Sequence, residues 1–338
     1  MQKQSRHLLR LMFAGAAAAL ALCASTAAEA RVVMLAKQYG ISYLPLTIME
    51  EKHLLEAEGK KLGLDLTTKW VRFTGGPPMN EALISGNLDF ASGGIGPFVT
   101  VWSRTVDNLK VKGICALDSM PLYLNSINPE VKTIKDFTEK DRIALPAVRV
   151  SMQAVILQMA AEKVFGKGQE HKLDPWTVSL SHPDGLAQMM SFKSQITAHF
   201  TSAPFMYREL EDKRVHRVLN SYDVFGGSHT FIVVWAAAKL YENEPKVVQA
   251  FLAAMREAIK QIHDDPAAAA ALWVKADQSK LSPAEVEKII RDPENKWTMT
   301  PEKVMVVADY MGRAKMIPVT PKSWKDMFID AIHDLPGS

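Results

Sequence analysis

Residues 81–98 read EALISGNLDFASGGIGPF, and this stretch decides the fold. Residues 82–84 predict a helix, residues 88–91 predict a strand, and the small residues 92–96 predict a loop. Pro97 then opens another helix, because proline is favoured in the first turn of a helix. This order is typical of one unit of an α/β fold.

The same order of elements extends toward the N-terminus. Residues 31–36 predict a strand, and Pro45 suits the first turn of a helix over about residues 44–55. A second strand is expected near residues 64–71, and the turn at residues 74–77 leads into the helix described above. Residues 31–98 therefore read as alternating strands and helices.

A second unit repeats this order. Strands are predicted at residues 142–145, 176–180 and 196–200, with a helix starting near Ser151 and another led by Pro204. Two such units predict an α/β protein with two lobes, each a mostly parallel sheet flanked by helices.

Turn residues mark two crossings between the lobes, near residues 117–126 and 221–230. We therefore expect a discontinuous first lobe, residues 31–118 and 225–338, which includes the C-terminal helices, and a second lobe, residues 119–224. Two crossings predict a ligand cleft between the lobes and a hinge behind it.

Residues 1–30 have the composition of a secretory signal peptide. A basic start precedes a short alanine- and leucine-rich run, and Ala28-Glu29-Ala30 is a small-x-small cleavage site. A membrane anchor is the alternative, which the alanine-rich run and the absence of a basic flank after it disfavour. Cleavage after Ala30 predicts a mature protein in the periplasm.

Charge and cysteine content exclude several classes of protein. Removal of residues 1–30, which hold three basic residues and one acidic residue, lowers the formal net charge from +3 to about +1. The mature chain therefore has no basic face that would predict nucleic-acid binding. Cys115 remains as the one cysteine of the mature chain, so no internal disulfide can form. Its apolar neighbours indicate a buried thiol.

Catalytic and metal-binding motifs are missing from the sequence. There is no Gly-x-Ser-x-Gly, no phosphate loop ending in Gly-Lys-Ser/Thr and no His-Glu-x-x-His, and the histidines show no metal-ligand spacing. We therefore expect a binding protein without catalytic residues, metal or cofactor, rather than an enzyme.

Loops rich in Gly, Ser and Thr stand where strands lead into helices. Ligands of open parallel sheets bind at the carboxyl ends of strands, and helix N-termini there offer N–H groups and partial positive charge to an anion. An arginine before a helix could add a bidentate bond to a carboxylate or sulfonate. The predicted ligand-binding residues are Ser42, Tyr43, Gly75, Gly76, Gly93, Gly94, Arg149, Ser151, Gln153 and Thr201.

Each of these residues also has a structural interpretation, which the sequence leaves open. Arg149 would suit an exposed loop equally well, Ser151 an N-cap, and Tyr43 packing inside its lobe. The glycines would suit turns with positive φ. His182 and His229 are expected to be polar neighbours of the cleft rather than ligand contacts.

Three segments together carry a resemblance to a known family: Ser42-Tyr43-Leu44-Pro45-Leu46, residues 81–98, and the region from Trp297 to Trp324. The chain resembles the substrate-binding proteins of nitrate/sulfonate/taurine-type ABC importers, which have the type II periplasmic binding fold, over essentially the whole mature sequence. There are two departures. Residues 193–197 lack the acidic residue usual there, and residues 146–150 replace a loop that is usually glycine-rich.

The resemblance implies a monomeric periplasmic protein that captures a small solute by hinge closure and delivers it to permease subunits and their ATPase. Helix N-termini and Arg149 favour a small organic anion, with Tyr43, Met120 and Met152 against its apolar body. Two alternatives remain: a ligand-sensing partner of a receptor kinase, and an enzyme on the same fold resembling those that make the thiamine pyrimidine.

Overall fold

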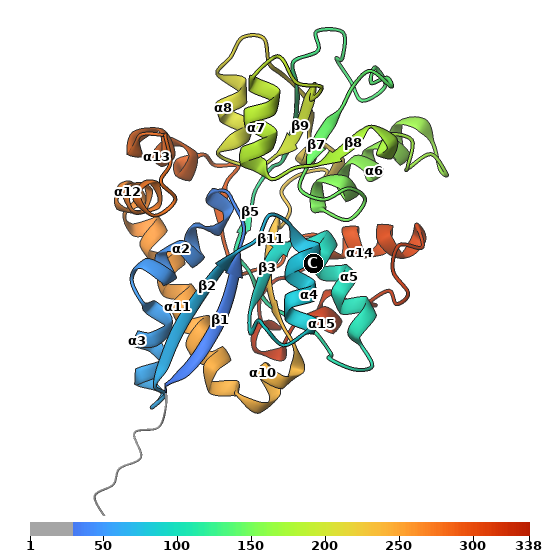
Figure 1. Ribbon diagram of the computed structural model, residues 1–338. Helices are drawn as coiled ribbons and strands as arrows, with labels where there is room; N and C mark the ends of the chain where they lie inside the picture. Colours follow the sequence, from blue (N-terminus) through green and yellow to red (C-terminus); the bar gives the residue numbers. More distant parts are fainter. Residues whose placement is uncertain (1–29) are drawn as a thin grey trace, which may run out of the picture. The chain divides into compact units, whose positions relative to one another are not determined.

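The computed structural model describes residues 30–338 of the chain (Figure 1). The predicted signal peptide lies outside the described residues, apart from Ala30 at its end, and stays a prediction. Residues 32–338 group as one unit, and the following description concerns that unit. Within the described part of the chain, no helix is long and apolar enough to cross a bilayer.

The first group of strands forms a two-stranded and a three-stranded sheet. The strands are β1 (Arg31–Lys37), β2 (Leu66–Arg72), β3 (Ala91–Gly94), β4 (Lys112–Ala116) and β11 (Ile232–Ala236). β1 pairs with β2, and a parallel bridge between Leu35 and Phe90 connects β1 to the start of β3. β11 lies between β3 and β4 and is antiparallel to both. Every residue of β11 is buried, as expected of a central strand covered on both faces.

The second group of strands forms one five-stranded sheet. In spatial order these are β10 (His216–Asn220), β6 (Tyr123–Ser126), β9 (Ala198–Thr201), β7 (Ile143–Leu145) and β8 (Thr177–Ser179). β7 is parallel to β8 and β9, whereas β6 is antiparallel to β9 and β10. The α/β class is confirmed, and the sheets are more mixed than the sequence indicates.

The mixed direction has a topological reason. Parallel neighbours need a crossover connection, usually a helix, and β7, β8 and β9 are joined in this way. β6 and β11 instead receive the chain from the other sheet, through residues 117–122 and 221–231 respectively. These two connections lie where the crossings are expected, and the lobe boundaries at residues 118 and 224 stay a prediction.

Helices of the two repeats cover these sheets. Those of the first repeat are η1 (Ile41–Tyr43), α2 (Leu44–Glu51), α3 (Leu54–Lys61), α4 (Gly76–Ile84) and α5 (Ile95–Thr105). Those of the second are α6 (Met152–Phe165), η2 (Asp174–Trp176), α7 (His182–Met190), α8 (Phe205–Leu210) and α9 (Ser221–Phe225). α7 and α8 pack together beside β9 (Figure 1).

Two elements differ from the sequence-based predictions. The expected loop at residues 92–96 is instead the end of β3 and the start of α5. The expected helix over residues 44–55 is two helices, because His53 has a left-handed φ of 50° that interrupts the chain of hydrogen bonds.

The C-terminal elements pack on helices of both repeats. They are α10 (Ala238–Asn243), α11 (Pro245–Asp264), α12 (Pro266–Ala276), α13 (Pro283–Arg291), α14 (Val304–Arg313), α15 (Trp324–Met327) and η3 (Asp330–Ile332), with β12 (Lys296–Trp297) paired to β5 (Asp118–Ser119). α11 packs against α2 and α3, and α14 contacts both α5 and α6. A capping box of Ser282 and Glu285 begins α13.

Aromatic side chains fill the core below the first group of strands. Phe90 stacks on Phe251 of α11 with ring centroids 4.3 Å apart. Phe98 of α5 contacts Trp235 at 5.7 Å and Phe328 at 5.2 Å between centroids. These contacts fix β11 and α5 against each other, and α5 begins at the cavity described below.

Candidate functional site

A small cavity is lined by loops and helix starts that belong to both groups of strands. Its free volume is about 20 Å³, roughly the space of one water molecule. No Lys, Arg, Asp or Glu lines it. The lining residues are Gln38, Tyr39, Tyr43, Gly76, Gly94, Pro97, Pro146, Ser151, Met152, Gln153, His182 and Phe231.

Four helices begin at this cavity. Gly76 is the first residue of α4, Gly94 is the N-cap of α5, Ser151 is the N-cap of α6, and His182 is the first residue of α7. The first N–H groups of a helix have no partner within it, and they carry the positive end of the helix dipole. The cavity is therefore electropositive without containing a cationic side chain.

Ser151 confirms the N-cap interpretation, since its hydroxyl accepts a hydrogen bond from Ala154 N at 3.2 Å. This cap fixes the first turn of α6, which places Met152 and Gln153 at the cavity. Ser151 lines the cavity as well, so the structural role and a ligand-binding role are compatible at this residue.

Glycines allow the two sides of the cavity to approach closely. A Cβ atom on Gly94 would lie 2.6 Å from Met152 Cβ, and one on Gly75 would lie 3.1 Å from the carbonyl oxygen of Pro146. None of Gly75, Gly76, Gly93 and Gly94 has a positive φ, so the turn interpretation of these glycines is wrong. Gly75 and Gly94 allow close packing across the cavity, whereas Gly76 packs on Pro97 and Gly93 on Gln38 and Trp235 of their own side.

A direct hydrogen bond also joins the two sides. Ile41 N donates to the carbonyl oxygen of Ala203 over 3.1 Å, next to Gly40, whose φ of 112° is in the region that favours glycine. A Cβ on Gly40 would lie 3.0 Å from that same oxygen. The contacts at Gly40, Gly75 and Gly94 together describe a closed arrangement around the cavity.

Tyr43 lines the cavity and is buried. Burial, and then the charge of Asp118, raise the pKa of its hydroxyl above the usual value, so the ring presents a neutral phenol. Ser42, beside it, is buried behind the lining, and its Oγ donates to Met120 Sδ at 3.3 Å. Tyr43 therefore reaches the cavity, whereas Ser42 does not line it.

Polar side chains of the second sheet form a chain that ends at the cavity. Gln153 Nε2 lies 3.3 Å from His182 Nε2, and His182 Nδ1 lies 3.3 Å from His199 Nε2. His199 Nδ1 is 2.6 Å from Glu209 Oε1. Thr201 Oγ1 joins this chain at 2.9 Å from His182 Nδ1. All five residues are buried.

The structure thus sorts the ten predicted ligand-binding residues. Half of them line the cavity: Tyr43, Gly76, Gly94, Ser151 and Gln153. Four lie immediately behind it: Ser42, Gly75, Gly93 and Thr201. Arg149 does neither, because it is exposed on the loop before α6 with a left-handed φ of 66°. Direct ligand contact by these residues stays a prediction.

Three polar residues of the site were not predicted from the sequence. His182, expected to be only a polar neighbour, lines the cavity, and His199 and Glu209 stand behind it. The available signal was alternation along residues 198–201, which places His199 on one face of the strand together with Thr201. His229 is a polar neighbour as expected: its ring nitrogens bond Thr230 O and Ser221 Oγ, each at 2.8 Å.

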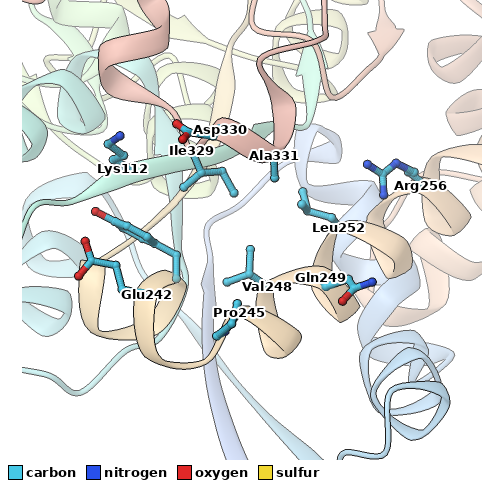
Figure 2. Close-up of a pocket in the computed structure, with 11 residues that line it drawn as sticks. Lys112, Glu242, Pro245, Val248, Gln249, Leu252, Arg256, Ile329, Asp330 and Ala331 are labelled. Atoms are coloured by element: carbon cyan, nitrogen blue, oxygen red, sulfur yellow. The ribbon is translucent and has the colours of Figure 1, made fainter.

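A larger hollow of about 570 Å³ lies elsewhere, between α10, α11 and residues 329–331. Figure 2 shows its charged side chains spread around it, with Val248 and Leu252 of α11 between them. None of the described residues that line it belongs to the second group of strands or its helices, whereas both groups contribute to the smaller cavity. We therefore place the candidate site at the smaller cavity.

Residues 30–338 contain no cluster of side chains that would support metal or thiol chemistry. Within that range, no three His, Cys, Asp or Glu side chains stand together in a way that could hold a metal ion. Cys115 is fully buried, and burial raises the pKa of its thiol well above the usual value. The thiol is therefore a structural group, as its apolar sequence neighbours predict.

Comparison with known proteins finds similarity in structure alone. No protein-family profile and no curated protein sequence matches the chain. The alkanesulfonate-binding protein SsuA from Xanthomonas axonopodis pv. citri, solved with MOPS bound, superposes with a TM-score of 0.67 at 18% identity, covering 87% of this chain and 96% of that one. The periplasmic nitrate-binding protein NrtA from Synechocystis PCC 6803 gives 0.67 at 14% identity, covering 86% and 83%.

A Candida albicans protein described as exhibiting the generic periplasmic binding protein fold is also similar. Its TM-score is 0.66 at 13% identity, and the match covers 86% of this chain and 92% of that one. Similarity at these identities shows the fold and not the ligand. The expectation of a periplasmic-binding-protein fold, made from the residues and the resemblance, is confirmed.

Proposed function

We propose that this protein is the periplasmic solute-binding component of an ABC importer and that it captures a small organic anion. One observation carries the proposal: four helices, two from each repeat, begin at one enclosed cavity. The fold supports it, because structural neighbours with this fold have been solved as alkanesulfonate- and nitrate-binding proteins.

The electrostatics of the cavity favour an anion over a cation or a neutral solute. Each helix N-terminus stabilises a nearby negative charge by about 0.3–1 kcal/mol, and by up to about 2 kcal/mol where it is partly buried. Four such ends add up to several kcal/mol, with no cationic side chain to desolvate. Tyr39, Tyr43, Ser151 and Gln153 add neutral hydrogen-bonding groups around the charge.

Capture requires the cleft to open. A volume of about 20 Å³ does not hold a sulfonate or carboxylate group with an organic body. We propose that the predicted lobes, residues 31–118 with 225–338 and residues 119–224, separate about the connections at 117–122 and 221–231. A solute touched by both sides then favours the closed form.

The apolar part of the solute would meet aromatic and sulfur-containing side chains. Tyr39, Tyr43, Met152 and Phe231 all line the cavity, and Met152 can change rotamer at small cost. Arg149 is exposed on the loop before α6. We propose that it attracts the anion in the open form, which affects the association rate more than the final contacts.

The remaining parts of the proposal follow from the same role. The signal peptide would direct the chain to the periplasm, where it acts as a monomer and passes its solute to the permease and its ATPase. Binding proceeds without turnover of the solute. No specific observation favours the sensory or enzymatic alternative.

Thermal unfolding of the mature chain tests the proposal. Sulfonates, aromatic and aliphatic carboxylates, nitrate and pyrimidines are screened, and an anion at 100 times its Kd adds about 2.7 kcal/mol to the free energy of unfolding. At roughly 2 °C or more per kcal/mol, the melting temperature rises by several degrees. The proposal is refuted if no anion in the screen raises it.

A matched pair of variants on α6 locates the site. Gln153 and Gln158 are both buried glutamines of this helix, but Gln153 lines the cavity and Gln158 bonds Asp174 at 3.0 Å. We expect Q153A to lose the thermal shift produced by the anion. Q158A should be less stable than the wild type and should keep that shift.

A further inference from the structure

A buried chain of side chains connects the core of the second sheet to the cavity. It runs from Glu209 of α8 through His199 of β9 and His182 of α7 to Gln153 of α6. Glu209 and His199 have no exposed surface, and His182 and Gln153 are 7% and 2% exposed. Of these residues, His182 and Gln153 line the cavity. We call Glu209, His199 and His182 the relay.

The direction of the first hydrogen bond is fixed by Glu209. Asn125 Nδ2 donates to its Oε2 over 2.9 Å, and His199 Nδ1 lies 2.6 Å from its Oε1. We take Glu209 as ionised, so that both of its oxygens accept. In that state the hydrogen of the bond to Oε1 is carried by His199 Nδ1.

When both histidines are neutral, the remaining directions follow. His199 Nε2 then has no hydrogen and accepts, so His182 Nδ1 donates toward it and toward Thr201 Oγ1. His182 Nε2 is left as an acceptor at the cavity, where Gln153 Nε2 faces it at 3.3 Å. An acceptor at this position repels the oxygens of an anion.

One added proton reverses these directions. The proton binds His182 Nε2 from the cavity side, and the hydrogen on His182 Nδ1 passes to His199 Nε2, 3.3 Å away. His199 then carries both hydrogens and the positive charge, beside the Glu209 carboxylate at 2.6 Å. His182 is again neutral, but its Nε2 now carries a hydrogen. The amide of Gln153, whose Nε2 is also a donor, has to rotate away so that His182 Nε2 donates into the cavity.

Burial favours this placement of the charge. Desolvation, and then the charge on His199, lower the pKa of His182 well below its usual value, so the imidazole at the cavity stays neutral. His199 is the ring that touches a carboxylate, and it is the better position for the cation.

We propose that capture of the anionic solute is coupled to uptake of one proton by the relay, which turns His182 Nε2 from an acceptor into a donor at the cavity. This inference rests on the proposed function. His182 contacts the solute in this scheme, whereas His199 and Glu209 are positioning residues that set its tautomer.

Other titratable groups around the relay are few in the described chain. α6 contributes the amide of Gln153, β6 the amide of Asn125, and β7 only apolar residues at 143–145. On α7 itself, Asp184 accepts from Ser181 Oγ. Across the cavity stand Tyr39 and Tyr43, with Asp118 behind Tyr43.

Nitrogen chemical shifts of the histidine side chains in the solute-free mature chain test the relay directly. Between pH 8 and pH 5 we expect His182 to change from the tautomer with a hydrogen on Nδ1 to the one with a hydrogen on Nε2. A tautomer of His182 that does not change over this range overturns the proposal, whatever solute binds.

Calorimetry with ethanesulfonate as the probe tests the coupling. Titrations at pH 7 in phosphate and in Tris should differ in enthalpy, per solute bound, by up to the difference between the ionisation enthalpies of the two buffers. As the pH rises above the range in which the relay holds its proton, the affinity for ethanesulfonate should fall by up to tenfold per pH unit. Binding without proton uptake overturns this inference and leaves the proposed function standing. Failure of ethanesulfonate to bind even at pH 5.5 contradicts both for this solute class.

Two variants separate the relay from general structural effects. Glu209→Gln keeps an acceptor for His199 Nδ1 but removes the charge, and it should abolish proton uptake and the tautomer change of His182. Asp174→Asn is the matched control, because Asp174 bonds His171 at 2.9 Å outside the relay. It should alter neither readout. If E209Q does not fold, the wild-type titration still decides the question.

Discussion

Asp118 provides the most quantitative test of this structure, because a fully buried carboxyl group stands in the connection between the two sheets. Burial raises its pKa from 3.8 to about 7, although the hydrogen bond from Ile232 N acts in the opposite direction. Asp118 Oδ1 accepts from Ile232 N at 3.0 Å, and Oδ2 has no partner among the described residues. The neutral acid is therefore the form that fits this site.

The sign of the pH dependence follows from linkage. Between pH 4 and pH 7 the folded protein keeps the Asp118 proton, whereas the unfolded chain releases it. The contribution of Asp118 to stability is therefore full below about pH 4 and is lost as the pH rises through 7. A shift of about three pKa units corresponds to about 4 kcal/mol.

Asp118→Asn should remove this penalty, because the amide keeps an acceptor for Ile232 N and carries no charge. We expect the variant and the wild type to have similar free energies of unfolding near pH 4. At pH 8 the variant should be more stable, by up to about 4 kcal/mol. Urea denaturation of the mature chain at unit steps from pH 4 to pH 8 measures the difference.

Asp212→Asn is the control for that series. Asp212 is solvated, and hydrogen bonds from Arg214 lower its pKa to about 2, the opposite direction from Asp118. Relative to the wild type, D212N should not become more stable as the pH rises from 4 to 8. A constant difference between D118N and the wild type from pH 4 to pH 8 would refute the argument, as would a variant that is less stable at pH 8.

Three further outcomes are expected. Gly94→Ala places a Cβ 2.6 Å from Met152 Cβ and should hold the cleft open, which small-angle scattering would detect as a larger radius of gyration and which added M152G, lacking that Cβ, should reverse. Ser151→Ala removes the bond to Ala154 N and should cost about 1 kcal/mol in urea denaturation, a loss that S151T should largely avoid. Cys115 should react with a thiol reagent at pH 8 only after unfolding, and rapid labelling of the native protein would contradict its burial.

Local signals were sufficient for the elements of the fold. Apolar periodicity and a Ser at a strand-to-helix junction predict α6 and its N-cap, and the structure has both at Ser151. The break between α2 and α3 was missed, because His53 adopts a left-handed conformation that no Gly or Pro marks. The strands β6 and β11 were not predicted, because they lie in and next to the expected crossings, and their antiparallel direction depends on where the chain comes from.

The candidate site was predictable at the helix starts and not behind them. Gly94 stands out in the sequence as a small residue before a helix. A glycine is needed there because Met152, nearly sixty residues later in the chain, packs directly against it. His199 and Glu209 carry no motif, since they meet only when α8 packs on β9. Arg149 has the right chemistry for an anion, and its left-handed backbone on an exposed loop leaves it outside the cavity.

The sequence by itself determined the order of strands and helices, the caps at their ends and the two crossings, because these depend on interactions within a few residues. The tertiary structure alone decided which groups face the cavity. Helices that begin at Gly76, Ile95, Met152 and His182 meet there because their first turns and the loops before them pack together through glycine contacts. Such packing joins residues far apart in the chain, and no local pattern encodes it.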